Sequence, residues 1–149
     1  MEHPHTATSY NNIGNVYSDK GDYDKALEYY LKALATDEKI LGLEHPDTAG
    51  SYNNIGVVYV YKGDYDKALE YHLKALAIDE KISGLEHPDT AASYHNIGYI
   101  YSYKDDYDKA LEYYWKALTI FEQAFSETHP YVVRCRKNIE IVKSILENN

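Results

Sequence analysis

The sequence predicts an all-α protein of seven helices, three helical hairpins followed by a closing helix. Apolar residues recur at intervals of three and four, the period of an amphipathic helix. The chain also has four prolines, each 42 residues from the next and each preceded by a histidine: Pro4, Pro46, Pro88 and Pro130. A fixed period of this length indicates tandem copies of one unit. The three full copies span residues 2–43, 44–85 and 86–127.

The first helix of each unit is expected to begin at the proline, because proline's missing N–H would be unpaired at that position anyway. Asp47 and Asp89 follow two of the prolines, and an acidic side chain there is favoured by the helix dipole. The first helices are expected over residues 5–20, 47–62 and 89–104.

A short break then separates the two helices of each unit. Gly21 and Gly63 provide the positive φ that ends a helix, whereas the third unit has Asp105 there, so its turn is expected to be strained. The second helices are expected over residues 23–41, 65–83 and 107–125, and the closing helix over residues 130–147.

Glycine also occurs inside each first helix, at Gly14, Gly56 and Gly98. Each costs the helix roughly 1 kcal/mol relative to alanine, so a compensating contact is expected. We attribute it to close approach of the second helix, where Ala26 and Ala33 are small.

Composition limits the functional classes. A chain of 149 residues predicts one domain over residues 1–149, and its net charge of −9 disfavours nucleic acid and anionic lipid as partners. Only residues 130–149 carry a positive balance, +2. No apolar run reaches the roughly 18 residues of a membrane span, and the N-terminus lacks a secretory signal pattern, so we expect a cytoplasmic protein that does not contact membranes.

The spacing within a unit resembles the tetratricopeptide repeat, with tyrosine in place of its tryptophan and isoleucine in place of its leucine. The matching residues of the first unit are Tyr10, Ile13, Gly14, Tyr17, Ala26, Tyr30 and Ala33. The 42-residue period and the segment Gly-Leu-Glu-His-Pro-Asp-Thr-Ala at residues 84–91 are similar to the long repeats of kinesin light chain. The resemblance implies a right-handed α-solenoid that binds other proteins and has no catalytic activity.

In such a solenoid the first helices line the concave face. Residues 2–43 and 44–85 differ at eight positions, and four of these lie on the stripe expected there: Thr8/Gly50, Asn15/Val57, Ser18/Val60 and Asp19/Tyr61. Variation on one face of a constant scaffold favours recognition of a particular partner. Random drift on an exposed face is the alternative.

One asparagine per unit occupies the same place on this stripe: Asn12, Asn54, Asn96 and Asn138. An amide both donates and accepts hydrogen bonds, so it can hold the backbone of an extended peptide. Asparagines at this place bind peptides in tetratricopeptide domains, and the resemblance extends that role to these four. Alternatively, they bond the neighbouring helix and tie repeats together.

Aromatic and basic residues complete the predicted site. Tyr61, Tyr99 and Tyr103 offer flat contact area, and Arg134 and Lys137 could pair with a ligand carboxylate, or simply be solvated charges on a capping helix. The predicted ligand-binding residues are Asn11, Asn12, Asn15, Asn53, Asn54, Tyr61, His95, Asn96, Tyr99, Tyr103, Arg134, Lys137 and Asn138.

No cofactor, metal or catalytic site is expected. His45, His87 and His129 recur at repeat junctions, too far apart to share one ion, and the single Cys135 has no evident partner as a nucleophile. The rival to peptide binding is a structural role, as a segment of a longer array or in end-to-end self-association through an uncovered first helix.

Overall fold

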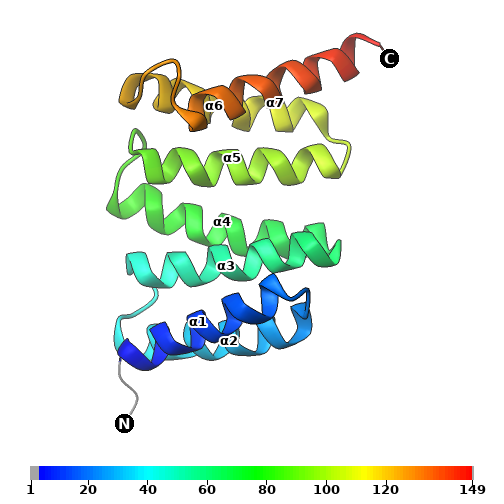
Figure 1. The fold of residues 1–149 in the computed structure, drawn as a ribbon. Coiled ribbons are helices and arrows are strands. Elements are labelled where there is room, and N and C mark those ends of the chain that lie inside the picture. The colour runs from blue at the N-terminus through cyan, green and yellow to red at the C-terminus, as the bar shows by residue number, and fades with distance from the viewer. Residues whose placement is uncertain (1–3, 149) are drawn as a thin grey trace. The chain divides into compact units, whose positions relative to one another are not determined.

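The structure, a computed structural model, describes the backbone of residues 4–148 and the side chains of residues 6–148. It confirms the predicted all-helical fold: the described residues form helices and turns, without a strand (Figure 1). The helices are α1 (Pro4–Asp19), α2 (Tyr23–Ile40), α3 (Pro46–Lys62), α4 (Tyr65–Ile82), α5 (Pro88–Tyr103), α6 (Tyr107–Ala124) and α7 (Pro130–Glu147).

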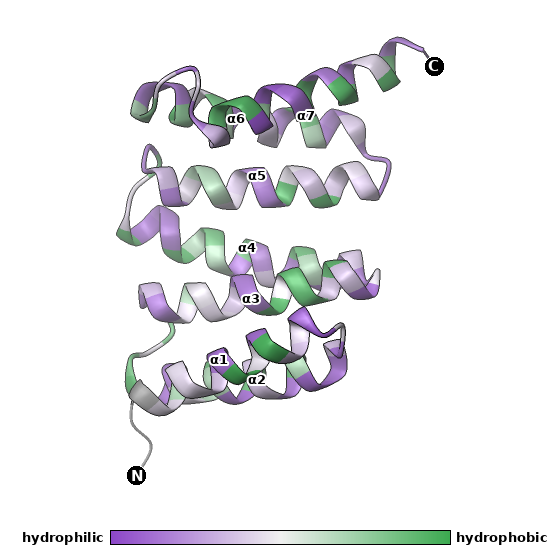
Figure 2. Cartoon of the chain, viewed as in Figure 1, coloured by the Kyte–Doolittle hydropathy of each residue, from purple (hydrophilic) through white to green (hydrophobic). Residues whose placement is uncertain are grey.

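Packing divides the chain into two compact units, Met1–Ile78 and Asp79–Asn149. In the first unit α2 packs against both α1 and α3, and in the second α6 packs against both α5 and α7. Each helix carries both polar and apolar residues (Figure 2), and in an amphipathic helix the apolar ones share one face. The single domain predicted over residues 1–149 stays a prediction.

The histidine before each of the last three prolines caps a helix. In His45, His87 and His129 the Nδ1 atom accepts a hydrogen bond from the backbone N–H two residues later, at 3.0, 3.0 and 3.1 Å. Each of the three has an extended backbone, and proline follows at the first helical position. A side-chain acceptor at this position satisfies one of the unpaired N–H groups of the helix start. The recurring histidines therefore have a structural role that the sequence analysis did not assign.

The turn inside each hairpin requires a positive φ, as predicted. Gly21 has φ 80° and Gly63 has φ 79°, and Asp105 takes the same conformation with φ 62°. Asp105 alone of the three carries a side chain, which accepts a hydrogen bond of 2.9 Å from the hydroxyl of Tyr107. The backbone conformation is disfavoured for a side chain, so this turn is the strained one.

We predict that Asp105→Gly raises the free energy of unfolding by on the order of 0.5–1 kcal/mol, because glycine relieves the strained φ. The midpoint of urea denaturation measures the change. Tyr107→Phe is the control, since it removes the Asp105 hydrogen bond and leaves the backbone strain in place. A lowered midpoint for Asp105→Gly would mean that the hydrogen bond outweighs the strain.

The helix glycines are needed because a ring from the second helix occupies the space beside them. A Cβ atom built on Gly14 would lie 2.6 Å from the ring of Tyr30, and one on Gly56 would lie 2.6 Å from the ring of His72. Gly98 has the same relation to Tyr114, at 2.9 Å. The predicted close approach of the second helix is confirmed: the nearest atoms belong to an aromatic or imidazole ring, and beside Gly98 the backbone oxygen of Ala110, the counterpart of Ala26, also lies within 3.2 Å.

Buried hydrogen bonds join α2 to α3 within the first unit. Ser51 Oγ donates to a carboxylate oxygen of Asp37 at 3.0 Å, and the Tyr52 hydroxyl donates to Glu38 at 3.1 Å. Asp37 is only 5% exposed, and burial raises the pKa of its carboxyl group. A buried carboxylate depends on its hydrogen-bond donor, so Ser51 fixes the register of this junction.

The second unit repeats this junction. Ser93 donates to Asp79 at 2.8 Å, and Tyr94 donates to Glu80 at 3.1 Å. The same residue types at the same spacing therefore produce the same contacts in both units.

We predict that Ser51→Ala lowers the free energy of unfolding by about 1–3 kcal/mol, because Asp37 loses its buried donor. The matched control is Ser9→Ala, which changes the equivalent but exposed residue of the first unit and should alter stability by less than about 0.5 kcal/mol. Both substitutions change helix propensity equally, so their difference reports the buried bond. Equal effects in urea denaturation would contradict this account.

Candidate functional site

Two of the three predicted asparagines of α1 are involved in the packing of the hairpin. The Tyr30 hydroxyl donates to Oδ1 of Asn15, and Oδ1 of Asn11 is buried without a hydrogen-bond partner among the described residues. Asn12 is exposed. The ring of Tyr30 is also the one that requires glycine at position 14. The same core side chain therefore packs against Gly14 and bonds Asn15 of the predicted binding stripe.

In α3, Asn53 is the counterpart of Asn11, and unlike Asn11 it is bonded to the second helix of its hairpin. Asn53 Oδ1 accepts a hydrogen bond of 2.9 Å from Nδ1 of His72, while Asn54 is half-buried. Tyr61 is 61% exposed and stacks on Tyr23, with ring centroids 5.3 Å apart. The ring of Tyr61 is therefore held at the surface by its stacking on Tyr23.

In the second unit Asn138 ties α7 to α5. Its Nδ2 donates to Nε2 of His95 at 2.9 Å. Burial, together with the charge of Arg134, lowers the pKa of His95 to about 4, so its ring is neutral at pH 7 and Nε2 can accept. The alternative role considered for the asparagine series, tying repeats together, is therefore confirmed at Asn138.

The exposed tyrosines of α5 form a pair. Tyr99 and Tyr103 lie one helical turn apart, with their hydroxyls 2.8 Å apart and their rings edge to face at 4.8 Å. They are 40% and 48% exposed. Lys137, on α7, is also exposed.

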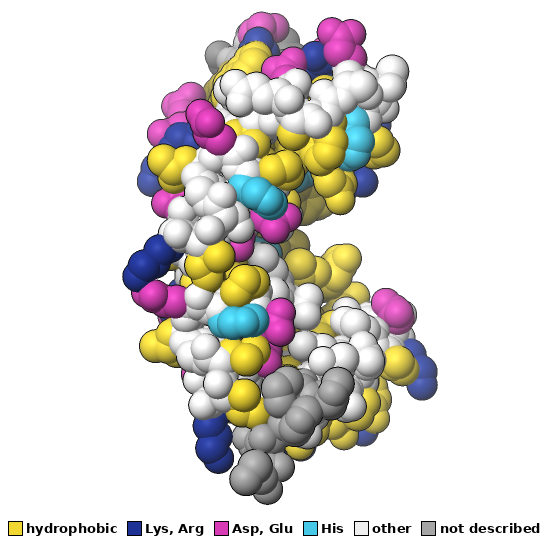
Figure 3. Space-filling model, turned by 90° about the vertical axis from the view of Figure 1, so that its left-hand side faces the viewer, with side chains coloured by type: hydrophobic (Ala, Val, Ile, Leu, Met, Phe, Trp, Pro, Cys, Tyr) yellow, Lys and Arg dark blue, Asp and Glu magenta, His cyan; other side chains and the backbone are white. Residues whose placement is uncertain are grey.

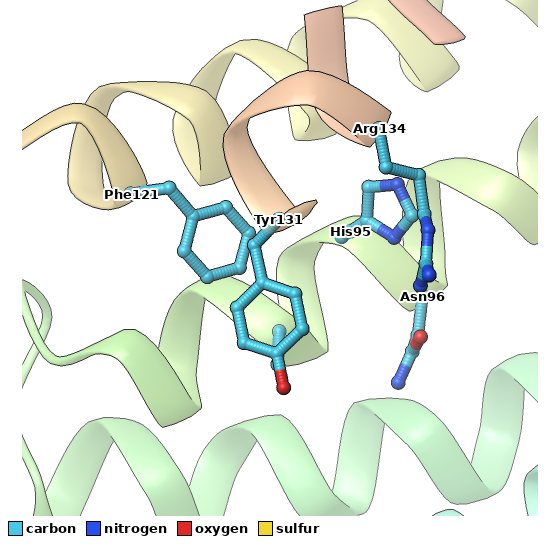
Figure 4. Close-up of a pocket in the computed structure, with 6 residues that line it drawn as sticks. His95, Asn96, Phe121, Tyr131 and Arg134 are labelled. Atoms are coloured by element: carbon cyan, nitrogen blue, oxygen red, sulfur yellow. The ribbon is translucent and has the colours of Figure 1, made fainter. Parts of the chain in front are cut away.

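A pocket of about 190 Å³ lies among α5, α6 and α7. Its lining residues are Ala92, His95, Asn96, Phe121, Tyr131 and Arg134. Figure 4 shows the rings of Phe121 and Tyr131 on one side, and Arg134 extending past His95 towards Asn96 on the other. The structure therefore brings three predicted residues together, and their amide, imidazole and guanidinium groups face an aromatic wall.

Sequence reasoning missed Phe121 and Tyr131. Their centroids are 5.4 Å apart, and Tyr131 is 47% exposed. Phe121 stands where the two earlier junctions have Asp37 and Asp79, and Tyr131 follows its proline where those junctions have Asp47 and Asp89. Loss of two acidic residues at one junction was the signal that could have revealed the pocket.

At the junction of α6 with α7, the other polar contacts seen at the two earlier junctions are also replaced by different ones. Arg136 pairs with Glu122 at 2.6 Å, where the earlier junctions have a tyrosine-to-glutamate hydrogen bond. Cys135 stands in the place of Ser51 and Ser93 and is buried, which raises the pKa of its thiol to about 12. A buried, protonated thiol is a poor nucleophile, so Cys135 acts as packing.

Among the described residues, no group of three or more histidine, cysteine or acidic side chains is placed to hold a metal ion. Histidine side chains do appear at the surface in Figure 3, and those of His45, His87 and His129 are used as helix caps. None of the described helices combines the length and apolar character needed to cross a membrane.

Comparison with known families gives three overlapping matches to the tetratricopeptide repeat, over residues 5–81, 47–123 and 89–148. The chain belongs to the tetratricopeptide-repeat family. Such repeats mediate protein–protein interaction or assembly and are typically non-catalytic. No curated protein matches the chain.

Solved structures place the repeats with the kinesin-light-chain type. The chain superposes on BtubC (BKLC) from P. vanneervenii with a TM-score of 0.88 and 22% identity, covering 97% of this chain and 58% of that one. A putative kinesin light chain from Podosopora anserina superposes with a TM-score of 0.85 and 25% identity, covering 95% of this chain and 67% of that one. RapI superposes with a TM-score of 0.87 and 23% identity, covering 99% of this chain and 52% of that one. This tetratricopeptide-repeat chain thus spans little more than half of BtubC and of RapI.

We predict that the protein loses stability between pH 7 and pH 5. Burial lowers the pKa of His72 to about 4, and that of His95 is similarly low, whereas an unfolded histidine titrates near 6.5. Between these values the unfolded chain binds more protons, so stability is full above the unfolded pKa and falls as pH drops towards 4. Each histidine contributes a loss of about 2 kcal/mol at pH 5.

His72→Tyr tests this, because Tyr30 and Tyr114 occupy the same position in the other units. Urea denaturation of wild type and variant at pH 7 and pH 5 should show the pH-dependent loss reduced by about 2 kcal/mol in the variant. The raised pKa values of Asp37 and Asp79 act in the opposite direction, but they are common to both proteins and cancel in the comparison. An unchanged loss would show that His72 is not buried neutral.

Proposed function

We propose that the protein is a non-catalytic interaction module that binds an extended peptide or a segment of a partner protein on the faces of its first helices. The observation that carries the proposal is the pocket of the second unit, where Asn96 and Arg134 lie opposite Phe121 and Tyr131. Small polar sets beside an aromatic wall are typical of ligand sites.

The chemistry of the pocket defines the segment that it would accept. Arg134 is exposed, and its guanidinium suits a carboxylate, with which it can form two parallel hydrogen bonds. Tyr131 and Phe121 offer apolar contact for a neighbouring side chain. His95 is neutral and already bonded to Asn138, so Arg134 supplies the charge of the pocket. The preferred ligand carries an acidic residue close to an apolar one.

The asparagine series supports backbone binding at three of its four positions. The side chains of Asn12, Asn54 and Asn96 are exposed or half-buried and make no hydrogen bond with other described residues, in contrast to Asn138. Each could therefore hold the N–H and C=O of an extended peptide. Tyr61 in the first unit, and Tyr99 and Tyr103 in the second, add aromatic contact area.

We predict that Asn96→Ala weakens binding of a partner several-fold, through loss of hydrogen bonds of about 0.5–1.5 kcal/mol each. Arg134→Glu should weaken the same partner by roughly 10-fold or more and reduce the salt dependence of binding, because a charged contact becomes repulsive. The measurement is calorimetric titration with a partner recovered by affinity capture, at two salt concentrations.

Two control variants separate the pocket from general effects. Lys20→Glu makes the same charge change at an exposed site of the first unit and should leave affinity within about two-fold of wild type. Asn54→Ala tests whether the first unit also takes part. Equal affinity for Asn96→Ala, Arg134→Glu and wild type would place the interface elsewhere.

A second candidate function is assembly through α1, favoured by one observation. Ile13 and Val16 are 39% and 51% exposed, whereas their counterparts in α3, Ile55 and Val58, are 0% and 1% exposed. Burial of exposed apolar surface drives association. Sedimentation equilibrium at several concentrations distinguishes an assembling protein from a monomeric peptide binder.

A further inference from the structure

The cap at the start of α7 depends on one ring nitrogen that must be unprotonated. Nδ1 of His129 accepts the hydrogen bond from the backbone N–H of Tyr131, so Nδ1 holds a lone pair and the proton of the ring lies on Nε2. Protonation of His129 would place a hydrogen on Nδ1 as well, and both nitrogens would then be donors. The cap therefore exists only while His129 is neutral, and histidine is the side chain that commonly changes charge between pH 5 and 8.

At the starts of α3 and α5 a second hydrogen bond secures the same turn. Thr48 Oγ1 donates to the carbonyl oxygen of Gly42 at 2.8 Å, and Thr90 Oγ1 donates to that of Gly84 at 2.7 Å. In α7 this position is Val132, which has no hydroxyl group. Within the described part of the chain, the cap of His129 is thus the one side-chain hydrogen bond that ties the first turn of α7 to the preceding loop.

The first two capping histidines also have carboxylates beside them. Nδ1 of His87 lies 3.7 Å from a carboxylate oxygen of Asp89. Burial raises the pKa of Asp79, and the charge of His87 acts in the opposite direction, so these two groups are within electrostatic range. His45 stands in the same relation to Asp37. A histidine that is protonated at either site therefore gains attraction to acidic side chains as it loses its cap.

His129 has aromatic rings where those histidines have carboxylates. Phe121 and Tyr131 replace the aspartates of the earlier junctions, and the ring of His129 lies 4.9 Å from that of Tyr131, edge to face. It also stacks on Phe125 at 4.0 Å. Stacking does not use the Nδ1 lone pair, so it can persist when the cap is lost. The first turn of α7 holds no acidic residue, so the helix dipole opposes a positive charge at this end.

The charged groups around this end of α7 do not compensate a proton on His129. Glu122 of α6 pairs with Arg136 at 2.6 Å, and Glu127 of the preceding loop also acts on Arg136. Arg134 extends into the pocket and has the same sign of charge as a protonated histidine (Figure 4). Among the described carboxylates, none forms an ion pair with His129. The third cap therefore differs from the first two in its response to acid.

We propose that His129 is an acid-sensitive cap that controls the pocket of the second unit. In its neutral form it holds the first turn of α7, and with it Tyr131, against Phe121. Protonation frees the N–H of Tyr131, loosens this turn and separates the two rings, whereas the starts of α3 and α5 stay closed. The role of the cap in regulating binding rests on the proposed function, but the loosening itself is tested without a ligand.

The test follows the full chain by NMR between pH 7.5 and pH 5.5, where histidines titrate. The amide proton of Tyr131 should move upfield in parallel with the titration of the His129 ring. Hydrogen-exchange protection of Val133, whose N–H bonds the carbonyl oxygen of His129, should fall roughly 5-fold after correction for intrinsic exchange, as expected for loss of one helix cap. Ala49 and Ala91, the equivalents of Val133, should change by less than about two-fold, because the gained attraction offsets the lost cap.

Substitutions identify the group responsible. His129→Asn keeps a side-chain acceptor that does not titrate, so the fall in protection at Val133 should disappear. Tyr131→Asp supplies the carboxylate that Asp89 supplies beside His87, and it should reduce the fall to less than about two-fold. His87→Asn is the matched control, because it changes the same cap at α5 and should leave the response of Val133 unaltered.

Three results would overturn the proposal. The first is a Tyr131 amide resonance that stays in place while the His129 ring titrates. The second is an equal loss of protection at Ala49, Ala91 and Val133, which would indicate a general effect of acid. The third is an unchanged response in His129→Asn, which would assign it to another histidine. A chain that shows the expected response but binds no peptide would refute the proposed function and leave the acid-sensitive cap established.

Discussion

Each hairpin depends on one contact, a ring of the second helix set against a glycine of the first. Tyr30, His72 and Tyr114 occupy this position, and any side chain on the facing glycine would collide with the ring. The rings also reach the outer face: Tyr30 bonds Asn15, and His72 bonds Asn53. One close contact therefore both closes the hairpin and decides which asparagines remain available to a ligand.

The junctions between repeats are the second constraint, and their variation creates the pocket. Two of them use an aspartate bonded to serine, which is buried at Asp37 and half-buried at Asp79. Burial raises the pKa of both carboxyls, so the charged form is costly and each needs its donor. The junction of α6 with α7 has Phe121 in place of the aspartate, and this ring forms one wall of the pocket. The binding site thus arises where the repeat departs from its own pattern.

The two surfaces proposed for partners follow different physical rules. The pocket relies on a cation, an amide and aromatic rings, so its ligand should be sensitive to salt. The face of α1 relies on apolar burial. Ile13 and Val16 remain exposed there, although their counterparts in α3 are buried. The two candidate functions therefore rest on interactions of different kinds.

The sequence by itself determined the helices, their ends and the strained turn. Predicted ranges such as 5–20 and 65–83 agree with Pro4–Asp19 and Tyr65–Ile82, because helix period, proline and glycine act over a few neighbouring residues. Only the tertiary structure decided which partner each polar side chain bonds and which remains available to a ligand. Asn138 bonds His95 across 43 residues, and Phe121 meets Tyr131 in the pocket, contacts that depend on how separate helices pack. A repeat period places residues in equivalent positions, but the partner of each is set by side chains of another helix, which differ between units.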